Sequence, residues 1–215
     1  MTDWATISSF ATGAGTLVLA IATFGAVRSG NRAARTAERA LQAGLRPLLM
    51  HSRLDDPPQK IMWLDRHWAM LNGGRAHVAV EDGNIYLAMS LRNAGSGIAV
   101  LHGWYPVTEA QMRDSQRGPV DPENFRRLTR DEYVASGDTG FWQGAVRHTA
   151  DEPDDLYDTL FPIVEAKELF GIDVLYSDHE GGQRTISRFA IVGRDNGEWL
   201  ATVSRHWNLD RDDPR

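Results

Sequence analysis

A run of 24 uncharged residues close to the N-terminus, Trp4 to Val27, constrains the fold of this chain more than any other feature. A helix of about 20 apolar residues is long enough to cross the hydrocarbon core of a bilayer. A secretory signal peptide carries basic residues before its apolar core, whereas here only Asp3 is charged before the run and the basic residues follow it. We therefore expect residues 1–27 to form one uncleaved transmembrane helix; the alternative is a buried helix of a soluble protein.

The residues that follow predict a basic helical stalk over 28–46. This segment is rich in Ala, Arg, Gln and Glu, which favour helix, and Pro47 ends it. An excess of Arg marks the cytoplasmic flank of a membrane span. The sequence thus predicts a single-pass protein of the bacterial inner (cytoplasmic) membrane, with its N-terminus outside and its C-terminal domain in the cytoplasm.

Four arginines of the stalk are spaced by four, three and four residues, so they share one face of a helix. This arginine stripe, which would bind anionic membrane lipid, is made by Arg28, Arg32, Arg35 and Arg39. The alternative is an ordinary solvated flank of the membrane span. Small residues within the span, such as Ser9, Gly13, Ala22 and Ala26, would let two helices approach closely. We expect either a homo-oligomer or a protein partner in a membrane complex.

From Pro47 onward the pattern changes to short β-rich runs separated by turn residues. The expected fold is mainly β, an antiparallel, Ig-like β-sandwich over 47–209 with one or two short helices and a polar tail at 210–215. Segment 60–71 is ambiguous, with three aromatic residues that would share one helical face. Segment 111–138 reads as a long connection, and 151–167 as a short helix interrupted at Pro162. The expected strands are 47–53, 77–80, 85–92, 98–107, 139–148, 172–177, 183–192 and 200–206.

Two turn patterns carry a resemblance. Asn93-Ala94-Gly95-Ser96-Gly97-Ile98-Ala99 resembles the N-x-G-x-G-x-A turn in the β-sandwich domains of uncharacterised bacterial single-pass membrane proteins. Tyr176-Ser177-Asp178 before Gly181 is similar to a late hairpin of the same domains. The usual Pro before the Ala is Ile98 here. The resemblance implies a fold and a topology and no reaction.

Composition and motifs favour binding over catalysis. The net charge of −6 gives no global case for nucleic acid, and the absence of cysteine excludes thiolate metal sites and cysteine nucleophiles. The chain has no GxGxxG, GxxxxGK[ST], HExxH or GxSxG motif, and its seven histidines show no metal-ligand spacing. We predict no catalytic residue, no metal and no cofactor. The acidic cluster from Asp151 to Asp158 is read as a helix start.

The function expected from the sequence is a membrane-anchored binding or assembly module, for example an accessory subunit of a membrane complex. Aromatic residues flanked by glycines suggest a recognition surface over Phe141 and Trp142, and a second patch includes Trp63 and Trp68. One alternative is a hydrolase or carbohydrate-processing enzyme that uses the carboxylates of Asp138, Asp173 and Asp178. Another is an anionic-lipid sensor that acts through the arginine stripe.

Overall fold

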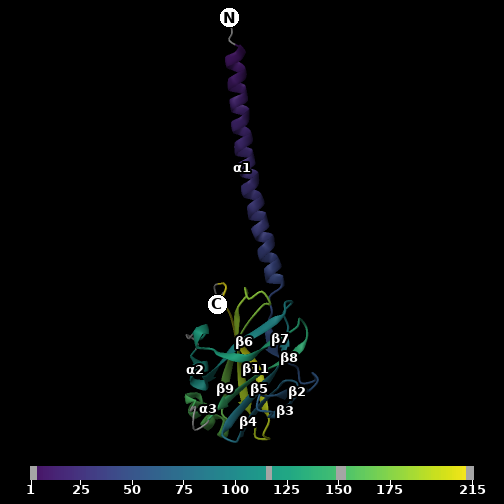
Figure 1. Cartoon of the computed structure of the whole chain (residues 1–215), viewed down its shortest axis with the longest axis vertical. Helices are drawn as coiled ribbons and strands as arrows, with labels where there is room; N and C mark the ends of the chain where they lie inside the picture. The colour runs from purple at the N-terminus through teal and green to yellow at the C-terminus, as the bar shows by residue number, and fades with distance from the viewer. Residues whose placement is uncertain (1–3, 115–117, 149–153, 212–215) are drawn as a thin grey trace. The chain divides into compact units, whose positions relative to one another are not determined.

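The computed structural model describes residues 4–114, 118–148 and 154–211 (Figure 1). The chain divides into two compact units, Met1–Gly44 and Leu45–Arg215. The first unit is one continuous helix, α1 (Trp4–Gly44), without a break between the expected span and the expected stalk. Its segment Gly13–Glu38 is long and apolar enough to cross a membrane by length and composition, with a mean hydropathy of 1.2.

Nine strands of the second unit form one antiparallel sheet, in the order β1-β5-β4-β11-β10-β9-β6-β7, with β8 paired to β5. A separate two-stranded hairpin pairs β2 with β3. The strands are β1 (Leu49–His51), β2 (Gln59–Met62), β3 (Trp68–Leu71), β4 (Arg75–Glu81), β5 (Asn84–Asn93), β6 (Ala99–Thr108), β7 (Arg126–Val134), β8 (Thr139–Arg147), β9 (Phe170–Ser177), β10 (Thr185–Gly193) and β11 (Trp199–Asn208).

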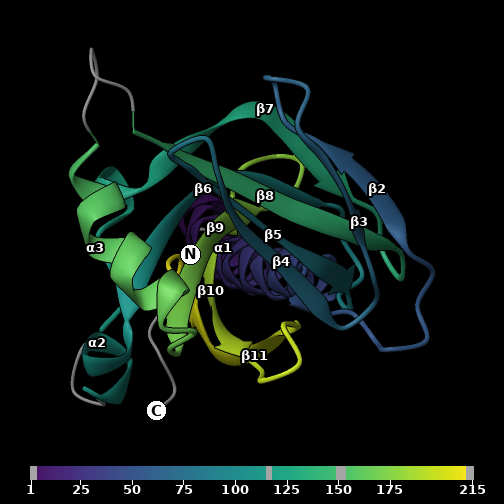
Figure 2. The same cartoon turned by 90° about the horizontal axis from the view of Figure 1, so that it is seen from below.

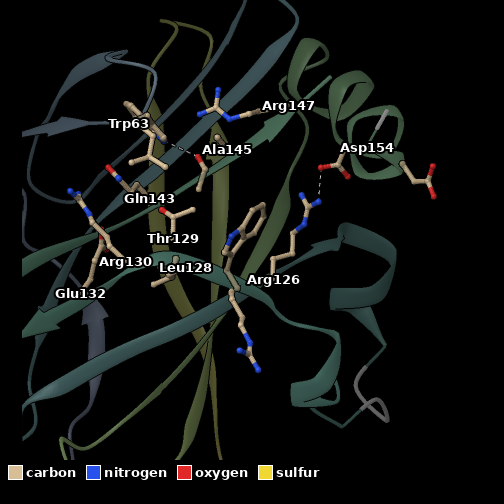
Figure 3. Close-up of a pocket in the computed structure, with 15 residues that line it drawn as sticks. Trp63, Arg126, Leu128, Thr129, Arg130, Glu132, Gln143, Ala145, Arg147 and Asp154 are labelled. Carbon is tan, nitrogen blue, oxygen red and sulfur yellow. Dashed lines mark hydrogen bonds and ion pairs between the residues drawn. The ribbon is translucent and has the colours of Figure 1, made fainter. Parts of the chain in front are cut away.

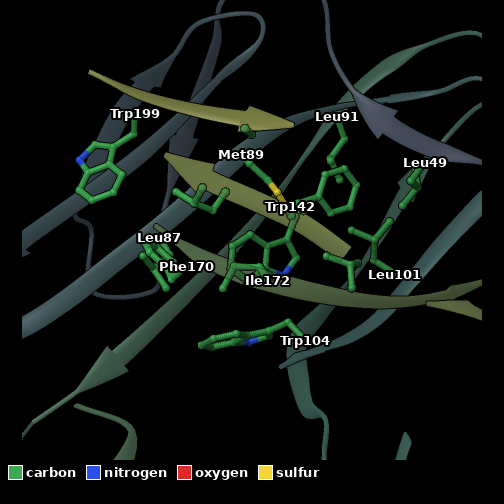
Figure 4. Close-up of a cluster of buried hydrophobic side chains, with 14 of the residues drawn as sticks. Leu49, Leu87, Met89, Leu91, Leu101, Trp104, Trp142, Phe170, Ile172 and Trp199 are labelled. Carbon is green, nitrogen blue, oxygen red and sulfur yellow. The ribbon is translucent and has the colours of Figure 1, made fainter. Parts of the chain in front are cut away.

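The sheet curls so that its inner face encloses the main core (Figure 2). The Trp104 and Trp142 rings pack edge to face in this core, with their centroids 5.3 Å apart, among side chains from β5, β6 and β9 (Figure 4). Gly144 makes room for them, because a Cβ at this position would lie 2.9 Å from the Trp142 ring and 3.1 Å from the Trp104 ring. A continuous curled sheet, rather than two stacked sheets, buries the core, so the Ig-like sandwich is not confirmed.

A bulge in β6 supports this curvature. The pairing of β6 with both β7 and β9 shifts register between Leu101 and Gly103, and bulges increase twist and bend strands. β7 comes close at this point, since a Cβ on Gly103 would lie 2.8 Å from the carbonyl oxygen of Arg126. Between Arg127 and Glu132, β7 has no ladder partner on β6.

Three helices are present in the described residues: α1, α2 (Glu109–Arg113) and α3 (Asp155–Glu165), with a short 3-10 turn, η1 (Pro122–Asn124). Helices α2 and α3 lie on one side of the curled sheet, and the β2–β3 hairpin lies on the opposite side (Figures 1 and 2). Helix α3 begins after the side-chain cap of Asp154 and continues through Pro162, where the sequence predicted an interruption. It buries Leu160 and Val164 in the main core.

The structure assigns two segments that the sequence analysis did not read as strands. Segment 60–71, which the sequence left ambiguous, forms the β2–β3 hairpin, in which the buried Ile61, Ala69 and Leu71 alternate with exposed side chains. Segment 111–138 contains β7, whose inward residues are mostly charged and so gave no apolar alternation. The other expected strands are confirmed, with boundaries that differ by a few residues.

The side chain of Asn93 makes four hydrogen bonds to three parts of the chain. Its Oδ1 accepts hydrogen bonds from the backbone N–H groups of Leu48 and Gly95, at 3.1 and 3.0 Å. Its Nδ2 donates to the carbonyl oxygens of Gly97 and Val134, at 2.6 and 3.0 Å. The buried amide thus connects the approach to β1, the turn after β5 and the end of β7.

The glycines of the N-x-G-x-G pattern allow this arrangement. A Cβ on Gly95 would lie 2.5 Å from the backbone nitrogen of Leu48, and a Cβ on Gly97 would collide with the carbonyl oxygen of Leu45. The backbone of Asn93 also pairs with the β7–β8 turn, through Asp138 O at 3.0 Å and Gly137 N at 2.9 Å. The N-x-G-x-G pattern therefore positions Asn93 so that its backbone binds the turn between β7 and β8.

We predict that Asn93→Ala lowers the free energy of unfolding by about 3 kcal/mol, because it leaves four backbone groups, two buried and two partly buried, without this partner. Denaturant unfolding of the purified protein measures this loss. Asn196→Ala, in the exposed β10–β11 turn, is the control and is expected to change stability by less than about 1 kcal/mol. Equal effects of the two substitutions would contradict the role given to Asn93.

Candidate binding surfaces

The predicted recognition residues separate into buried and exposed ones. Trp142 is 1% exposed and lies in the main core, which corrects the expectation that it forms a surface with Phe141. Trp63 is 4% exposed and packs under the hairpin, and Phe141 is partly buried beside it. Trp68 is 57% exposed. The cause is strand alternation, which turns Trp63 and Trp68 to opposite faces of the hairpin.

The arginine stripe lies on α1, where Arg28, Arg32 and Arg35 are exposed; the side chain of Arg39 lies outside the described ones. Arg46, which the sequence analysis placed in the stalk, belongs to the second unit. It donates to Asn208 Oδ1 at 3.0 Å and forms an ion pair with Asp210. The stalk helix therefore ends at Gly44, before this arginine.

The hairpin β2–β3 presents an exposed apolar face. Met62 lies opposite Trp68, and Lys60 lies opposite Met70, so the four side chains share the outer face. Met62 is 56% exposed and Met70 51%. Lys60 Nζ lies 4.8 Å from the centre of the Trp68 ring. With Leu64 in the adjoining loop, these residues (Lys60, Met62, Leu64, Trp68 and Met70) form what we call the hairpin face.

The opposite side of the hairpin attaches it firmly to β5 and β8. Ile61, Trp63, Ala69 and Leu71 pack on Tyr86 and Ala88. The Trp63 indole N–H donates to the Gly144 carbonyl oxygen at 2.9 Å. An outward apolar face on an attached hairpin is unusual, because an antiparallel sheet normally turns polar side chains to water.

Asp65 holds the tip of the hairpin. Its Oδ2 accepts from the Tyr86 hydroxyl at 2.6 Å and from Arg147 Nη1 at 2.5 Å. Burial opposes ionisation of Asp65, but the hydrogen bonds from Tyr86 and Arg147 outweigh it and lower its pKa to about 2. The His67 ring stacks on Tyr86 with centroids 4.0 Å apart. These contacts fix the hairpin face in place at neutral pH.

A second surface is a groove of about 620 Å³ between β7 and β8 (Figure 3). This is within the volume range of ligand pockets. The two strands are consecutive in the chain but end the sheet on opposite sides: β7 is paired with β6, and β8 with β5. They touch beside their turn, where a Cβ on Gly140 would lie 2.6 Å from the Val134 side chain. Farther from the turn the groove separates them.

We call this the β7–β8 groove. Its walls carry four arginines: Arg126, Arg127, Arg130 and Arg147. Arg126 lies 5.7 Å from the Trp104 ring and pairs with Asp154 at 2.5 Å. Arg130 Nε lies 3.3 Å from Glu132 Oε1. Acidic residues lining the same groove are Glu132, Asp154 and Asp155, so the arginines exceed them by one.

Glu132 is the most perturbed carboxyl group beside the groove. Its side chain is nine-tenths buried, and its Oε2 has no hydrogen-bond partner in the described part of the chain. Burial raises the pKa of Glu132 to about 7, although Arg130 opposes the rise. Carboxyl groups with a strongly shifted pKa are frequent at functional sites, where they are kept although they destabilise the folded protein.

The carboxylates proposed for an enzyme do not meet. Asp138 is exposed in the β7–β8 turn, and Asp173 is fully buried, with both oxygens bound by Arg188 at 2.7 Å. Asp178 accepts from the backbone of Gly182 and Gln183 and so caps a turn. Among the described residues, no three His, Asp or Glu side chains form a metal-binding group. Asp151 and Glu152 lie outside the described residues.

Sequence reasoning missed both surfaces in part. Lys60, Met62 and Met70 were passed over because the segment was not recognised as a hairpin. The available signal was two short apolar runs, Ile61–Leu64 and Trp68–Leu71, separated by three polar residues. The groove arginines were passed over because β7 was read as a connection. The closely spaced arginines at 126, 127 and 130 were the available signal.

Comparison with known proteins gives no family. No family model matches this chain, and no curated protein matches it. A solved structure that it resembles is that of a protein provisionally named ApaA from Bordetella pertussis, with a TM-score of 0.23 and 11% identity over 77% of this chain and 94% of the other. At that TM-score the likeness carries no argument about fold or function.

We predict that Glu132→Gln stabilises the protein at neutral pH. A carboxyl whose pKa is raised in the folded state binds more protons there than in the unfolded state, so stability falls as pH rises from about 4.5 to 7. The variant lacks this loss and should gain roughly 2 to 3 kcal/mol at pH 8 and little at pH 4.

Denaturant unfolding at a series of pH values measures the effect. Glu168→Gln, an exposed residue after α3, is the control and should leave the pH profile unchanged. A wild-type profile that coincides with that of Glu132→Gln would show that the Glu132 carboxyl ionises normally.

Proposed function

We propose that this protein is a non-enzymatic, membrane-anchored binding and assembly module that contacts another subunit of a membrane complex through the hairpin face. The single observation that carries the proposal is the exposed, rigidly held apolar surface of Met62, Trp68 and Met70. Aromatic residues and Met are enriched at protein interfaces, and Trp is the residue type most often dominant in their energetics.

The proposal commits to an apolar protein surface as the partner. Five of the exposed large apolar residues of the second unit fall between positions 54 and 70: Leu54, Met62, Leu64, Trp68 and Met70. A single exposed apolar residue needs no explanation, whereas several on one face mark an interaction site. Lys60 and Arg66 add positive charge beside the apolar centre, as is usual for the rim of an interface.

Membrane anchoring is the second element of the proposal. It is supported by one helix long and apolar enough to span a bilayer, Gly13–Glu38. The arginines that follow the uncharged run favour a cytoplasmic position for residues 45–215 under the positive-inside rule. In this arrangement the anchor confines the binding module to the inner membrane, which raises its effective concentration near membrane-bound partners. The Ig-like topology and contact of the arginine stripe with anionic lipid remain parts of this proposal.

The test is affinity purification of the full-length protein in native nanodiscs, with wild type, Trp68→Ser and Ile98→Ser compared. We expect a stoichiometric partner with wild type and with Ile98→Ser, and at least about a tenfold loss of it with Trp68→Ser. Ile98 is 41% exposed and lies outside the hairpin, so it is a matched removal of an exposed apolar side chain.

Both variants should retain the unfolding free energy of wild type within about 1 kcal/mol, because both side chains are exposed. Full retention of the partner by Trp68→Ser, or the absence of any stoichiometric partner, would contradict the proposal. Wild type and Trp68→Ser should bind partner-free anionic vesicles equally, because the proposal gives the hairpin face a protein partner. Weaker vesicle binding by Trp68→Ser would indicate that the hairpin face contacts lipid instead.

A further inference from the structure

The β7–β8 groove lies between the two end strands of the sheet. The sheet runs continuously from β7 through β6, β9, β10, β11 and β4 to β5, which pairs with β8, so β7 and β8 are its two facing ends. Between the described residues of β7 and β8, no backbone hydrogen bond crosses the groove. Each strand therefore has one edge of N–H and C=O groups in the ladder and one edge toward the groove.

An extended chain is the ligand that satisfies such edges. Free strand edges pair readily with another strand, and many recognition domains use this pairing to bind peptides. An inserted segment gains main-chain hydrogen bonds to both strands, apart from the Gly144 carbonyl oxygen of β8, which already accepts from the Trp63 indole. The bulged part of β7 between Arg127 and Glu132 has no ladder partner on β6, so this stretch has more unpaired backbone than an ordinary edge.

The side chains beside the groove specify the charge of the ligand. Arg127 is exposed and has no ion-pair or hydrogen-bond partner among the described side chains. Arg130 is 51% exposed and contacts Glu132 only through Nε, at 3.3 Å. A guanidinium has five N–H donors, so both groups retain donors for carboxylates. Glu132 takes only the Nε donor of Arg130, and its side chain is nine-tenths buried.

From the facing strand edges and the arginine walls we infer that the β7–β8 groove binds an extended, acidic segment of a partner protein as an added strand. The backbone of the segment pairs with β7 and β8, and its carboxylates contact Arg127 and Arg130. The groove adjoins the hairpin face at Leu64, which lines both, but the contacts proposed here are made by β7 and β8. The inference therefore adds a second binding mode to the proposed function and does not depend on it.

The test uses three fluorescein-labelled peptides and the full-length protein in nanodiscs. The groove is lined by residues between 126 and 132 on β7 and between 143 and 147 on β8, so a peptide of about eight residues covers its length. The first peptide alternates Glu with Val, the second alternates Lys with Val, and the third has proline in place of the two central Val residues of the first. Fluorescence anisotropy measures binding, and amide hydrogen exchange locates it.

The Glu–Val peptide is expected to bind with a micromolar Kd and to slow exchange in β7 and β8. The Lys–Val peptide should bind at least about tenfold more weakly, because it meets arginines. The proline peptide should also bind at least about tenfold more weakly, because proline removes the backbone donors that strand pairing needs. Equal binding of the Glu–Val and proline peptides would overturn the inference, since it would indicate attraction by charge alone.

Variants of the protein complete the test. The double variant Arg127→Ala/Arg130→Ala should weaken the Glu–Val peptide at least about tenfold. The control Arg194→Ala removes an exposed arginine from the β10–β11 turn and should leave binding unchanged. Trp68→Ser should also bind the peptide normally, which separates this site from the hairpin face. No binding of the Glu–Val peptide at millimolar concentration, or equal effects of the double variant and the control, would overturn the inference.

Discussion

The buried amide of Asn93 is the interaction on which the arrangement of the second unit depends. It holds the approach to β1, the turn after β5 and the end of β7 together, and its backbone holds the β7–β8 turn. Because β7 and β8 are tied at this end only, they are free to diverge away from it. One polar side chain thus closes one end of the curled sheet and allows the other to remain a groove.

The two candidate surfaces follow from how the remaining edges are covered. The β2–β3 hairpin covers the outer face of β5 and β8 with one apolar side and leaves its other apolar side open. The network around Asp65 links the hairpin to Tyr86 and Arg147. Arg147 also lines the β7–β8 groove, so the two surfaces share a structural residue.

The sequence predicted the positions of most strands along the chain, because their apolar residues alternate and the strands are separated by Gly, Asn and Asp turns. It predicted the N-terminal helix from length and composition alone. It did not predict that the strands pair in one curled sheet, because pairing depends on long-range contacts such as β4 with β11. The hairpin segment stayed ambiguous in the sequence because Trp63, His67 and Trp68 also fit a helical spacing over so short a segment.

The sequence could not predict which charged side chains pair, for a similar reason. Asp173 looked like a candidate catalytic carboxylate, but the register of β9 with β10 places it opposite Arg188 in a fully buried pair. Glu132 was not singled out in the sequence, and the structure buries nine-tenths of its side chain. Register and curvature, rather than residue type, decide which of these groups is available for function.

The measurement that tests this account most directly is residue-resolved amide hydrogen exchange of the ligand-free, full-length protein in nanodiscs. If β7 and β8 are the open ends of the sheet, groove-side amides of both strands exchange quickly while those of β9 and β10, which are paired on both sides, exchange slowly. Uniform slow exchange throughout β7 and β8 would show that the two strands pair with each other, and would contradict the open groove.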